Sequence, residues 1–595
     1  MNIFIYGSMK GICRKIGGLS AAFILGMSFF PREISAFPAN ASPSDAVTLS
    51  QGTAGPASGD SIIQFNQFGS YGLFIDGIRA ATGINTSRLM TSYSYRNFDG
   101  YRVHSSDYSH NVDLKFESAP SANTTFQVMG HYIDGQTRRP GSLTKKEFDS
   151  ACFQADPRAI NRDEKRVTQK GQAEVKYEAR FGKSLNQKIE VSGNGQIEYF
   201  ERVTNEFKIT TRYVMGLTAR YVCHFRMWDR TNEFSIGGNL LYQPERKEEY
   251  DNMAGQKSDN LEQIEVEKTS SSSCHVAGNF ELVERKLFLV LKGRYDHVVY
   301  SVAEESLPAR SDTKHYQAVT PEIGLNYKIL HGITLFASWE MNFKNPTDKE
   351  LESFYPDVLY NQDLKPQTSS TLKTGIKGVL EKKGTTSAFT SLHFDATLFS
   401  SRIDHEIVRY EIYGDEFYRN ATLTNRLGFT LHGSLEFFRA LSCSVSYTFS
   451  DYLYKTYTAR SLEADQAGTI LAVNRDFSGH AEPNIPRNNL NLALAYRHPL
   501  GKLCGISAKV SYSALSGIWV DDLNSDKTGS YNLFNTLLGF DVKAGHFALK
   551  ITGGVNNIFN QVYVGNSNIN SADRRFYDAG SPRDLVGSVN LGYFF

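Results

Sequence analysis

The sequence predicts an all-β protein, a transmembrane antiparallel β-barrel of about 22 strands of the bacterial outer-membrane type. Three observations carry this prediction. The last segment alternates between an apolar and a polar face, the connections between such segments differ sharply in length, and no apolar run of about 18 residues follows the N-terminal region. The mean hydropathy of −0.36 is compatible with a barrel, because every second strand residue faces a wet lumen.

The final segment, Leu585–Phe595, reads L-V-G-S-V-N-L-G-Y-F-F. Successive side chains point to opposite faces of a strand, so this segment has one apolar face and one small, mostly polar face. The apolar face carries Leu585, Val589, Leu591, Tyr593 and Phe595. Such an aromatic ending resembles the signal that the bacterial barrel-assembly machinery reads, and Tyr593 and Phe595 are expected to carry that signal.

Upstream segments repeat a hairpin unit. Thr536–Lys543 and Phe547–Val555 alternate on either side of a tight turn, and the long polar stretch Asn560–Pro582 follows. Tight periplasmic turns and long external loops are typical of outer-membrane barrels, and backbone groups in lipid must all pair, so the sheet is expected to close. Three further charged stretches are expected to be external loops: Asp134–Lys170, Pro244–Ser273 and Asn342–Pro366.

The N-terminal region has the order of a secretory signal peptide. Basic residues precede the apolar stretch Ile16–Phe30, and the small-residue sequence Ala39-Asn40-Ala41 fits a cleavage site. A membrane anchor is the alternative, but the apolar run is short for one. The expected organisation is a signal peptide over residues 1–41, a linker or plug remnant over 42–67, and a transmembrane barrel over 68–595.

Composition excludes other classes of protein. A formal net charge of +1 argues against a nucleic-acid binder, which would carry a basic surplus. The five cysteines beyond the predicted cleavage site show no C-x-x-C spacing, so neither a metal nor a redox site is expected there. His104, His110 and His131 also lack the tight spacing of metal ligands. No cofactor is expected.

Five segments resemble, in the same order, segments of the TonB-dependent outer-membrane receptor family of the iron-siderophore type. They are Phe343–Leu351 (F-K-N-P-T-D-K-E-L), Asn361–Thr368 (N-Q-D-L-K-P-Q-T), Tyr418–Ala421 (Y-R-N-A), Val555–Tyr563 (V-N-N-I-F-N-Q-V-Y) and Ala579–Arg583 (A-G-S-P-R). Gln362 and Gln367 depart from the family pattern, which more often has Pro and Glu there. These segments are mainly structural and identify the family, not the ligand.

The resemblance implies a monomeric, multi-pass protein of the bacterial outer membrane that contacts lipid and takes up a ferric chelate through its lumen. Family members carry an N-terminal plug inside the barrel and a TonB box before it, but only Ser42–Gln67 lies between the predicted cleavage site and the first barrel-like stretch. The plug is therefore expected to be missing. Coupling to the TonB–ExbB–ExbD complex would then require a plug from another source.

Aromatic and basic loop residues are the candidates for ligand contact, because charge and stacking could hold an anionic ferric chelate. They are Arg138, Arg139, Tyr452, Tyr454, Arg475, Arg574, Arg575 and Tyr577. The alternative for each residue is a solvated loop position or a place in an aromatic girdle, since exposed charges and tyrosines are common.

The preferred function is that of a receptor and transporter for an iron-siderophore-type chelate. The alternatives are a plugless passive diffusion channel, a degenerate receptor fragment, and a surface protein such as a phage or adhesion receptor. An enzyme is not expected, because no Ser, His and Asp stand in a nucleophile motif and G-x-S-x-G is absent.

Overall fold

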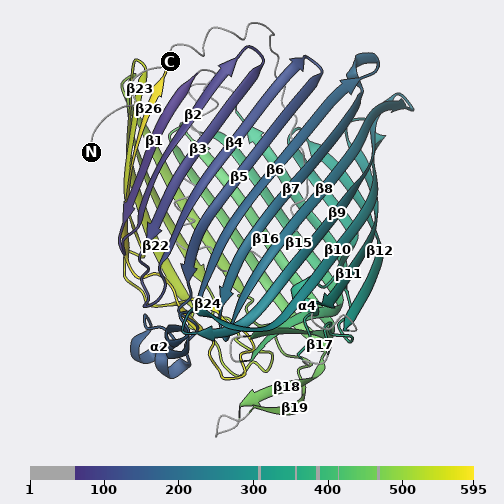
Figure 1. Ribbon diagram of the computed structural model, residues 1–595. Helices are drawn as coiled ribbons and strands as arrows, with labels where there is room; N and C mark the ends of the chain where they lie inside the picture. The colour runs from purple at the N-terminus through teal and green to yellow at the C-terminus, as the bar shows by residue number, and fades with distance from the viewer. Residues whose placement is uncertain (1–59, 306–309, 355–357, 383–388, 413–414, 465–469) are drawn as a thin grey trace.

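A computed structural model describes residues 60–305, 310–354, 358–382, 389–412, 415–464 and 470–595. Twenty-two of its strands form one sheet that closes into a barrel, in which each strand pairs antiparallel with its neighbours (Figure 1). The closing seam pairs β1 with β26, with Ser61 opposite Phe594. The prediction of a barrel of about 22 strands is confirmed. The predicted signal peptide, residues 1–41, lies outside the described residues.

The barrel strands, in chain order, are β1 (Ser61–Gly69), β2 (Phe74–Ile84), β3 (Ser87–Phe98), β4 (Asp107–Ser121), β5 (Thr124–Arg138), β6 (Lys165–Phe181), β7 (Gln187–Val203), β8 (Glu206–Met227), β9 (Arg230–Met253), β10 (Gln256–Val283), β11 (Leu287–Glu304), β12 (Ser311–Leu330), β13 (Ile333–Lys344), β14 (Gln367–Glu381), β15 (Phe389–Ile412), β16 (Asp415–Phe437), β17 (Leu441–Thr456), β20 (Asn488–Leu500), β21 (Cys504–Leu515), β22 (Tyr531–Ala544), β23 (Phe547–Asn556) and β26 (Asp584–Phe594).

The connections hold the other elements: α2 (Lys145–Ala151), α3 (Pro157–Asn161), the 3-10 turn η1 (Lys183–Leu185), α4 (Asp348–Leu351), the hairpin β18 (Thr458–Ala464) and β19 (Ile470–Asp476), and the pair β24 (Val564–Ser567) and β25 (Tyr577–Ala579). Among the described residues, no helix is long and apolar enough to cross a membrane.

The two ends of the barrel differ. At one end, here called the turn end, short turns join the strands. The turn between β22 and β23 is an example, and there Gly545 adopts the positive φ of 58° that a tight hairpin needs. The opposite end, here called the loop end, carries α2, α4 and the β18–β19 hairpin (Figure 1). Its long connections span residues 139–164, 345–366, 457–487, 516–530 and 557–583.

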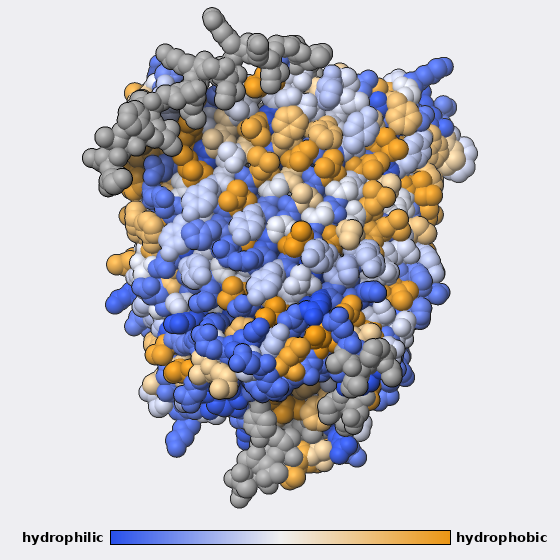
Figure 2. All heavy atoms as spheres, in the orientation of Figure 1, coloured by the Kyte–Doolittle hydropathy of each residue, from blue (hydrophilic) through white to orange (hydrophobic). Residues whose placement is uncertain are grey.

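Side chains alternate between the outside and the lumen along each strand. On β4, Leu114 lies on the outer face with 43% of its surface exposed, while its neighbours Asp113 and Lys115 line the lumen. Hydrophobic residues gather on the visible outer face toward the turn end, and hydrophilic residues gather toward the loop end (Figure 2). The strands therefore extend beyond an apolar belt, which is the surface that a bilayer core requires.

Packed apolar clusters lie at the loop end, under the long connections, because the barrel itself encloses a polar lumen. The fully buried Tyr454, Tyr457 and Phe477 form one cluster, and Val520, Phe576 and Tyr577 form another. The clusters hold the connections together at the rim, where each connection buries apolar side chains that neither lipid nor lumen would cover.

Two expected boundaries differ from the structure. The first barrel strand begins at Ser61, inside the segment 42–67 that was expected to be a linker or plug remnant. The expected external loop Pro244–Ser273 is instead strand, because β9 and β10 continue to a two-residue turn at Ala254 and Gly255, both with positive φ. Beyond the apolar belt both faces of a strand can be polar, so ion pairs such as Lys247–Glu267 (2.9 Å) replace the apolar alternation that marks a membrane strand.

Candidate ligand-binding site at the loop end of the barrel

Three arginines meet on the lumen wall near the loop end. The register places Arg166 of β6 directly opposite Arg202 of β7. Arg139 follows β5, and its backbone N–H donates to the carbonyl of Glu164 at 2.9 Å, which extends the same wall. Arg139, Arg166 and Arg202 are here called the basic cluster. Like charges directly opposite each other in a sheet are destabilising, so this arrangement needs a reason beyond stability.

The arginines of the basic cluster have few counter-charges. The nearest carboxylate oxygen to Arg166 is on Glu198, at 3.9 Å. Within the described part of the chain, neither Arg139 nor Arg202 forms an ion pair, and the Nε atoms of Arg166 and Arg202 are buried without a hydrogen-bond partner. By contrast, Lys208, which lies opposite Arg202 on β8, is paired with Glu206 at 2.8 Å and Glu249 at 2.6 Å. Unpaired guanidinium groups are fitted to bind a multiply charged oxyanion.

The surroundings of Arg139 disfavour the positive charge of its guanidinium group. The side chain is exposed to water, yet the concave wall surrounds it. This partial burial, and then the positive charges of Arg202 and Arg166, lower the pKa of Arg139, while Glu416 and Glu164 act in the opposite direction. An anion bound at this point would relieve the repulsion among the three arginines.

An aromatic ring lies beside the basic cluster. The guanidinium carbon of Arg166 lies 4.9 Å from the ring centroid of Phe200, and that of Arg212 lies 5.6 Å from the same centroid. Ring stacking restrains the side chain of Arg166 and leaves its N–H groups free to bind a ligand. The site can therefore bind an anionic group by charge and hydrogen bonding.

The residues predicted from sequence fall in different places. Arg139 belongs to the basic cluster, whereas its neighbour Arg138 pairs with Asp163 at 3.5 Å. Arg475 and Arg574 are exposed. The ring of Tyr452 lies under the guanidinium of Arg426, 5.0 Å from its carbon atom.

The remaining three predicted residues hold the connections together. Tyr454 is 1% exposed, and its hydroxyl donates to Oδ1 of Asp522 at 2.9 Å. Tyr577 is also 1% exposed and lies against Phe148 of α2, with ring centroids 5.7 Å apart. Arg575 pairs with Glu147 of α2 at 2.8 Å. The structure does not bring these residues to the basic cluster, and their part in ligand binding stays a prediction.

Arg166 and Arg202 were not predicted from the sequence. Both lie inside strands, and the feature that distinguishes them is cross-strand register, which pairs residues far apart in the chain. A search for basic residues at positions that alternate with outward apolar residues near strand ends would have included them.

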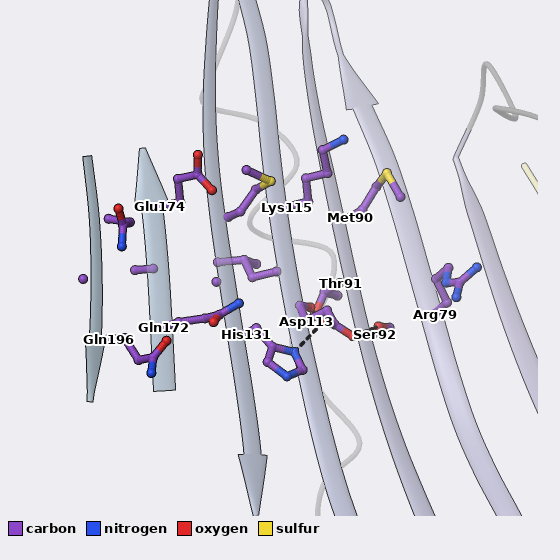
Figure 3. A pocket seen from close by; sticks show the side chains of 16 residues that line it. Arg79, Met90, Thr91, Ser92, Asp113, Lys115, His131, Gln172, Glu174 and Gln196 are labelled. Atoms are coloured by element: carbon purple, nitrogen blue, oxygen red, sulfur yellow. Dashed lines mark hydrogen bonds and ion pairs between the residues drawn. The ribbon is translucent and has the colours of Figure 1, made fainter. Parts of the chain in front are cut away.

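A cavity of about 670 Å³ lies on the lumen wall across β2 to β7 (Figure 3). On its wall Ser92 Oγ donates to Asp113 Oδ2 at 2.9 Å, and His131 Nδ1 lies 2.8 Å from Asp113 Oδ1. A serine hydrolase places the histidine between the serine and the acid, so that the histidine takes the serine proton. Here the aspartate stands in the middle, and the serine hydroxyl donates to the aspartate instead of to the histidine.

The other histidines considered from sequence also contact protein groups, and His104 Nε2 lies 3.7 Å from Asp163 Oδ1. His104 Nε2 lies 3.0 Å from the carbonyl oxygen of Glu164, and His110 Nδ1 lies 2.9 Å from the hydroxyl of Tyr93. Within the described residues, the group of side chains close enough together to hold a metal ion consists of Glu245, Glu267 and Asp348 and contains no histidine.

Comparison with known proteins gives one family and a set of related folds. The family model described as "TonB dependent receptor-like, beta-barrel" matches residues 41–558. The ferrioxamine B receptor of Salmonella typhimurium (strain SL1344) is 24% identical over 304 residues, which are 51% of this chain and 38% of that protein. The ferrichrome outer membrane transporter/phage receptor of Escherichia coli (strain K12) is 24% identical over 292 residues, 47% of this chain and 33% of that protein.

Solved structures share the fold. The ferric citrate transporter FecA in its unliganded form has a TM-score of 0.71 at 17% identity, covering 90% of this chain and 79% of that chain. The siderophore receptor PiuA from Acinetobacter baumannii has a TM-score of 0.69 at 14% identity, covering 90% and 82%. The matched regions amount to less than two fifths of the length of the two curated relatives.

Proposed function

The chain belongs to the TonB-dependent receptor family of bacterial outer-membrane barrels, and we propose that it takes up an anionic, iron-siderophore-type ferric chelate. One observation carries the proposal: three arginines face the lumen at the loop end, and Arg139 and Arg202 form no ion pair within the described part of the chain. The names of the curated relatives include ferrioxamine B and ferrichrome, which are ferric chelates, and this supports a ferric chelate as the ligand here. The preference for an anionic chelate rests on the arginines alone.

The loop end would face the outside of the cell. A chelate that enters it meets the basic cluster before it reaches the deeper wall of the lumen. Guanidinium forks bind carboxylate or phenolate oxygens bidentately, and Phe200 offers an apolar face beside them. Release toward the periplasm would depend on energy from the TonB–ExbB–ExbD complex acting on a plug. The chemistry is binding and transport, without bond breaking.

We also propose that the protein is not an enzyme. The order Ser92–Asp113–His131 on the lumen wall differs from that of a serine hydrolase, because the aspartate and not the histidine lies beside the hydroxyl, and this supports the proposal. A monomer in outer-membrane lipid, assembled through the aromatic signal at Tyr593 and Phe595, completes the proposed setting. The rings of these two residues lie 4.8 Å apart, with Tyr593 against Phe547.

Binding and uptake can be tested separately. Purified protein in non-ionic detergent is titrated with ferric citrate, which is anionic, and with a neutral ferric hydroxamate, while quenching of intrinsic fluorescence is followed. We expect saturable binding of the anionic complex and at least about tenfold weaker binding of the neutral one. Uptake of radioactive iron by cells that lack their own receptors should then require TonB. Equal affinity for the two complexes would contradict the role of the basic cluster.

A passive channel is the second candidate function, because polar side chains such as Asp113, Lys115 and His131 line the lumen. Single-channel recording of the full chain in a planar bilayer separates the two functions. A steady, large conductance that does not change with ferric chelate would favour the channel. A closed barrel that binds the chelate would favour the receptor.

A further inference from the structure

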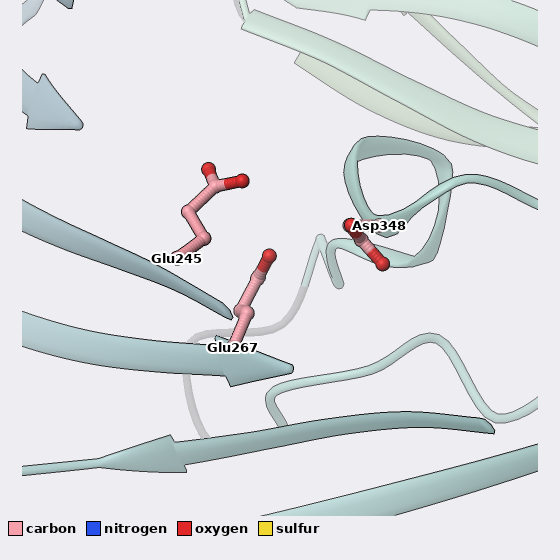
Figure 4. Close-up of side chains that lie close together, drawn as sticks. All are labelled: Glu245, Glu267 and Asp348. Carbon is pink, nitrogen blue, oxygen red and sulfur yellow. The ribbon is translucent and has the colours of Figure 1, made fainter. Parts of the chain in front are cut away.

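Three carboxylates from three elements converge near the loop end (Figure 4). Glu245 of β9 and Glu267 of β10 are direct cross-strand partners, and Asp348 is the first residue of α4. One oxygen atom from each of the three residues lies within 4.8 Å of the other two. These three residues are here called the carboxylate cluster.

The two glutamates are buried, and each has one oxygen without a partner. Glu245 is 3% exposed and Glu267 is 2% exposed. Arg212 Nε donates to Glu245 Oε2 at 2.5 Å, and Lys247 Nζ donates to Glu267 Oε1 at 2.9 Å. Glu245 Oε1 and Glu267 Oε2 are buried without a hydrogen-bond partner among the described residues. Buried carboxylate oxygens without a donor are costly, so a proton or a cation is expected between them.

A buried tyrosine hydroxyl in the same connection as Asp348 also lacks a hydrogen-bond partner among the described residues. This residue, Tyr360, is 1% exposed. The backbone of Tyr360 pairs with that of Glu352, just after α4. Burial, and then the negative charges of Glu267 and Asp348, raise the pKa of the Tyr360 hydroxyl. A buried hydroxyl that donates to neither neighbouring acid is best explained by an additional group, such as an ion with its water shell.

The balance of charge favours a cation over a single proton. Glu352 also accepts from Lys247 at 2.9 Å, so four carboxylates face Arg212 and Lys247. Among the described residues, Asp348 accepts only from neutral donors, Thr269 Oγ1 at 2.9 Å and Gln243 Nε2 at 3.3 Å. Arg212 is shared with Glu198 at 3.4 Å, and Glu352 also faces Lys208 and Arg202, so the three carboxylates of the cluster outnumber the two cations that pair with them. All the donor atoms are oxygens, and hard divalent cations prefer such a set.

We propose that Glu245, Glu267 and Asp348 bind a divalent cation of the Ca²⁺ class. The ion would join α4, and through it the connection 345–366, to the inner wall formed by β9 and β10. Because Ca²⁺ takes about six to eight oxygen ligands, waters would complete its shell. The ion would fix the position of a loop-end connection, so this role is separate from recognition of the ferric chelate.

The test is a calorimetric titration of Ca²⁺ alone into the full chain, purified in non-ionic detergent, freed of lipopolysaccharide and treated with a chelator. We expect one site per chain with a Kd of about 10⁻⁴ to 10⁻³ M, the range of extracellular Ca²⁺ modules. Glu267→Gln and Asp348→Asn should each weaken binding by about tenfold or more, since each removes a ligand charge. Glu340→Gln is the matched control, because Glu340 is also a strand glutamate paired with a lysine, Lys373 at 2.6 Å.

Folding of each variant is checked by its heat-dependent shift on gel electrophoresis. Asp348→Asn is the safer variant for folding, because Asp348 lies in a connection outside the barrel sheet. Absence of saturable Ca²⁺ binding in the wild type would overturn the proposal. So would unchanged affinity in both cluster variants, or an equal loss in Glu340→Gln. If Glu267→Gln is more stable than the wild type and Ca²⁺ affects neither protein, the carboxylates share a proton instead of binding a cation. Ferric chelate binding is measured independently, so failure here leaves that function standing.

Discussion

Replacement of Arg139 by Gln should weaken the ligand and strengthen the fold at the same time. Arg139 has no ion-pair partner among the described residues, and burial together with the charges of Arg202 and Arg166 disfavours its positive charge. Removing that charge relieves repulsion within the basic cluster. For an exposed charge beside two like charges, the relief is roughly 0.2–1 kcal/mol in the free energy of unfolding.

The effect on binding has the opposite sign and is larger. A hydrogen bond to a charged group contributes about 1.5–3 kcal/mol, and each 1.4 kcal/mol is about a tenfold change in Kd. Arg139→Gln should therefore weaken binding of an anionic ferric chelate by about 10- to 100-fold. Binding is measured by fluorescence titration with ferric citrate, and stability by guanidinium unfolding in detergent.

The neighbouring residue supplies a matched control. Arg138 has the same chemistry, but it pairs with Asp163 at 3.5 Å and is 44% exposed. Arg138→Gln should leave the Kd unchanged and lower stability by roughly 0–1 kcal/mol, as expected for an exposed ion pair. Equal losses of affinity in the two variants, or a loss of stability in Arg139→Gln, would contradict the assignment of Arg139 to an anion-binding site.

Three further predictions concern the connections and the last strand. Thr347→Ala should lower the free energy of unfolding by about 1 kcal/mol, because Thr347 and Glu350 form the capping box of α4, and denaturant unfolding of the two proteins measures this. Tyr454→Phe should lower the free energy of unfolding by about 1.5–3 kcal/mol at neutral pH, through the lost hydrogen bond to Asp522. Burial raises the pKa of Asp522 above 3.8, so as the pH falls the folded state takes up this proton before the unfolded state does. The penalty of Tyr454→Phe should therefore shrink between neutral pH and pH 3.8, whereas a penalty independent of pH would contradict this role of the hydroxyl. Phe595→Ser should reduce severalfold the fraction of chain that reaches a folded barrel in cells, seen as a smaller heat-shifted band, and unchanged assembly would remove Phe595 from the proposed signal.

The sequence was sufficient to predict strands wherever one face meets lipid and the other meets the lumen. Leu441–Thr456 and Phe547–Asn556 alternate in hydropathy because their surroundings alternate. Near the loop end this cause disappears. In Pro244–Ser273 both faces can be polar. The charged sequence was therefore predicted to be a loop, whereas the chain continues there as strands β9 and β10.

The site was less accessible from sequence than the fold. Arg139 could be proposed as a ligand contact because a basic residue in an expected loop can be recognised from the sequence alone. Arg166 and Arg202 are separated in sequence and become neighbours only through the register of β6 and β7. Tyr454 and Tyr577 appeared as loop aromatics that could stack on a ligand, but burial under the connections is decided by packing between distant segments.

The seam between β1 and β26 has a consequence for the order of assembly. Ser61 pairs with Phe594, so the cylinder is completed by the two segments that lie farthest apart in the described chain. Until β26 has been made, β1 has one edge without a partner, and an open edge cannot persist in hydrocarbon. The barrel can therefore close only after β26 has been synthesised, through contacts between residues that are very far apart in the chain. Until then, the early strands must be kept away from the hydrocarbon.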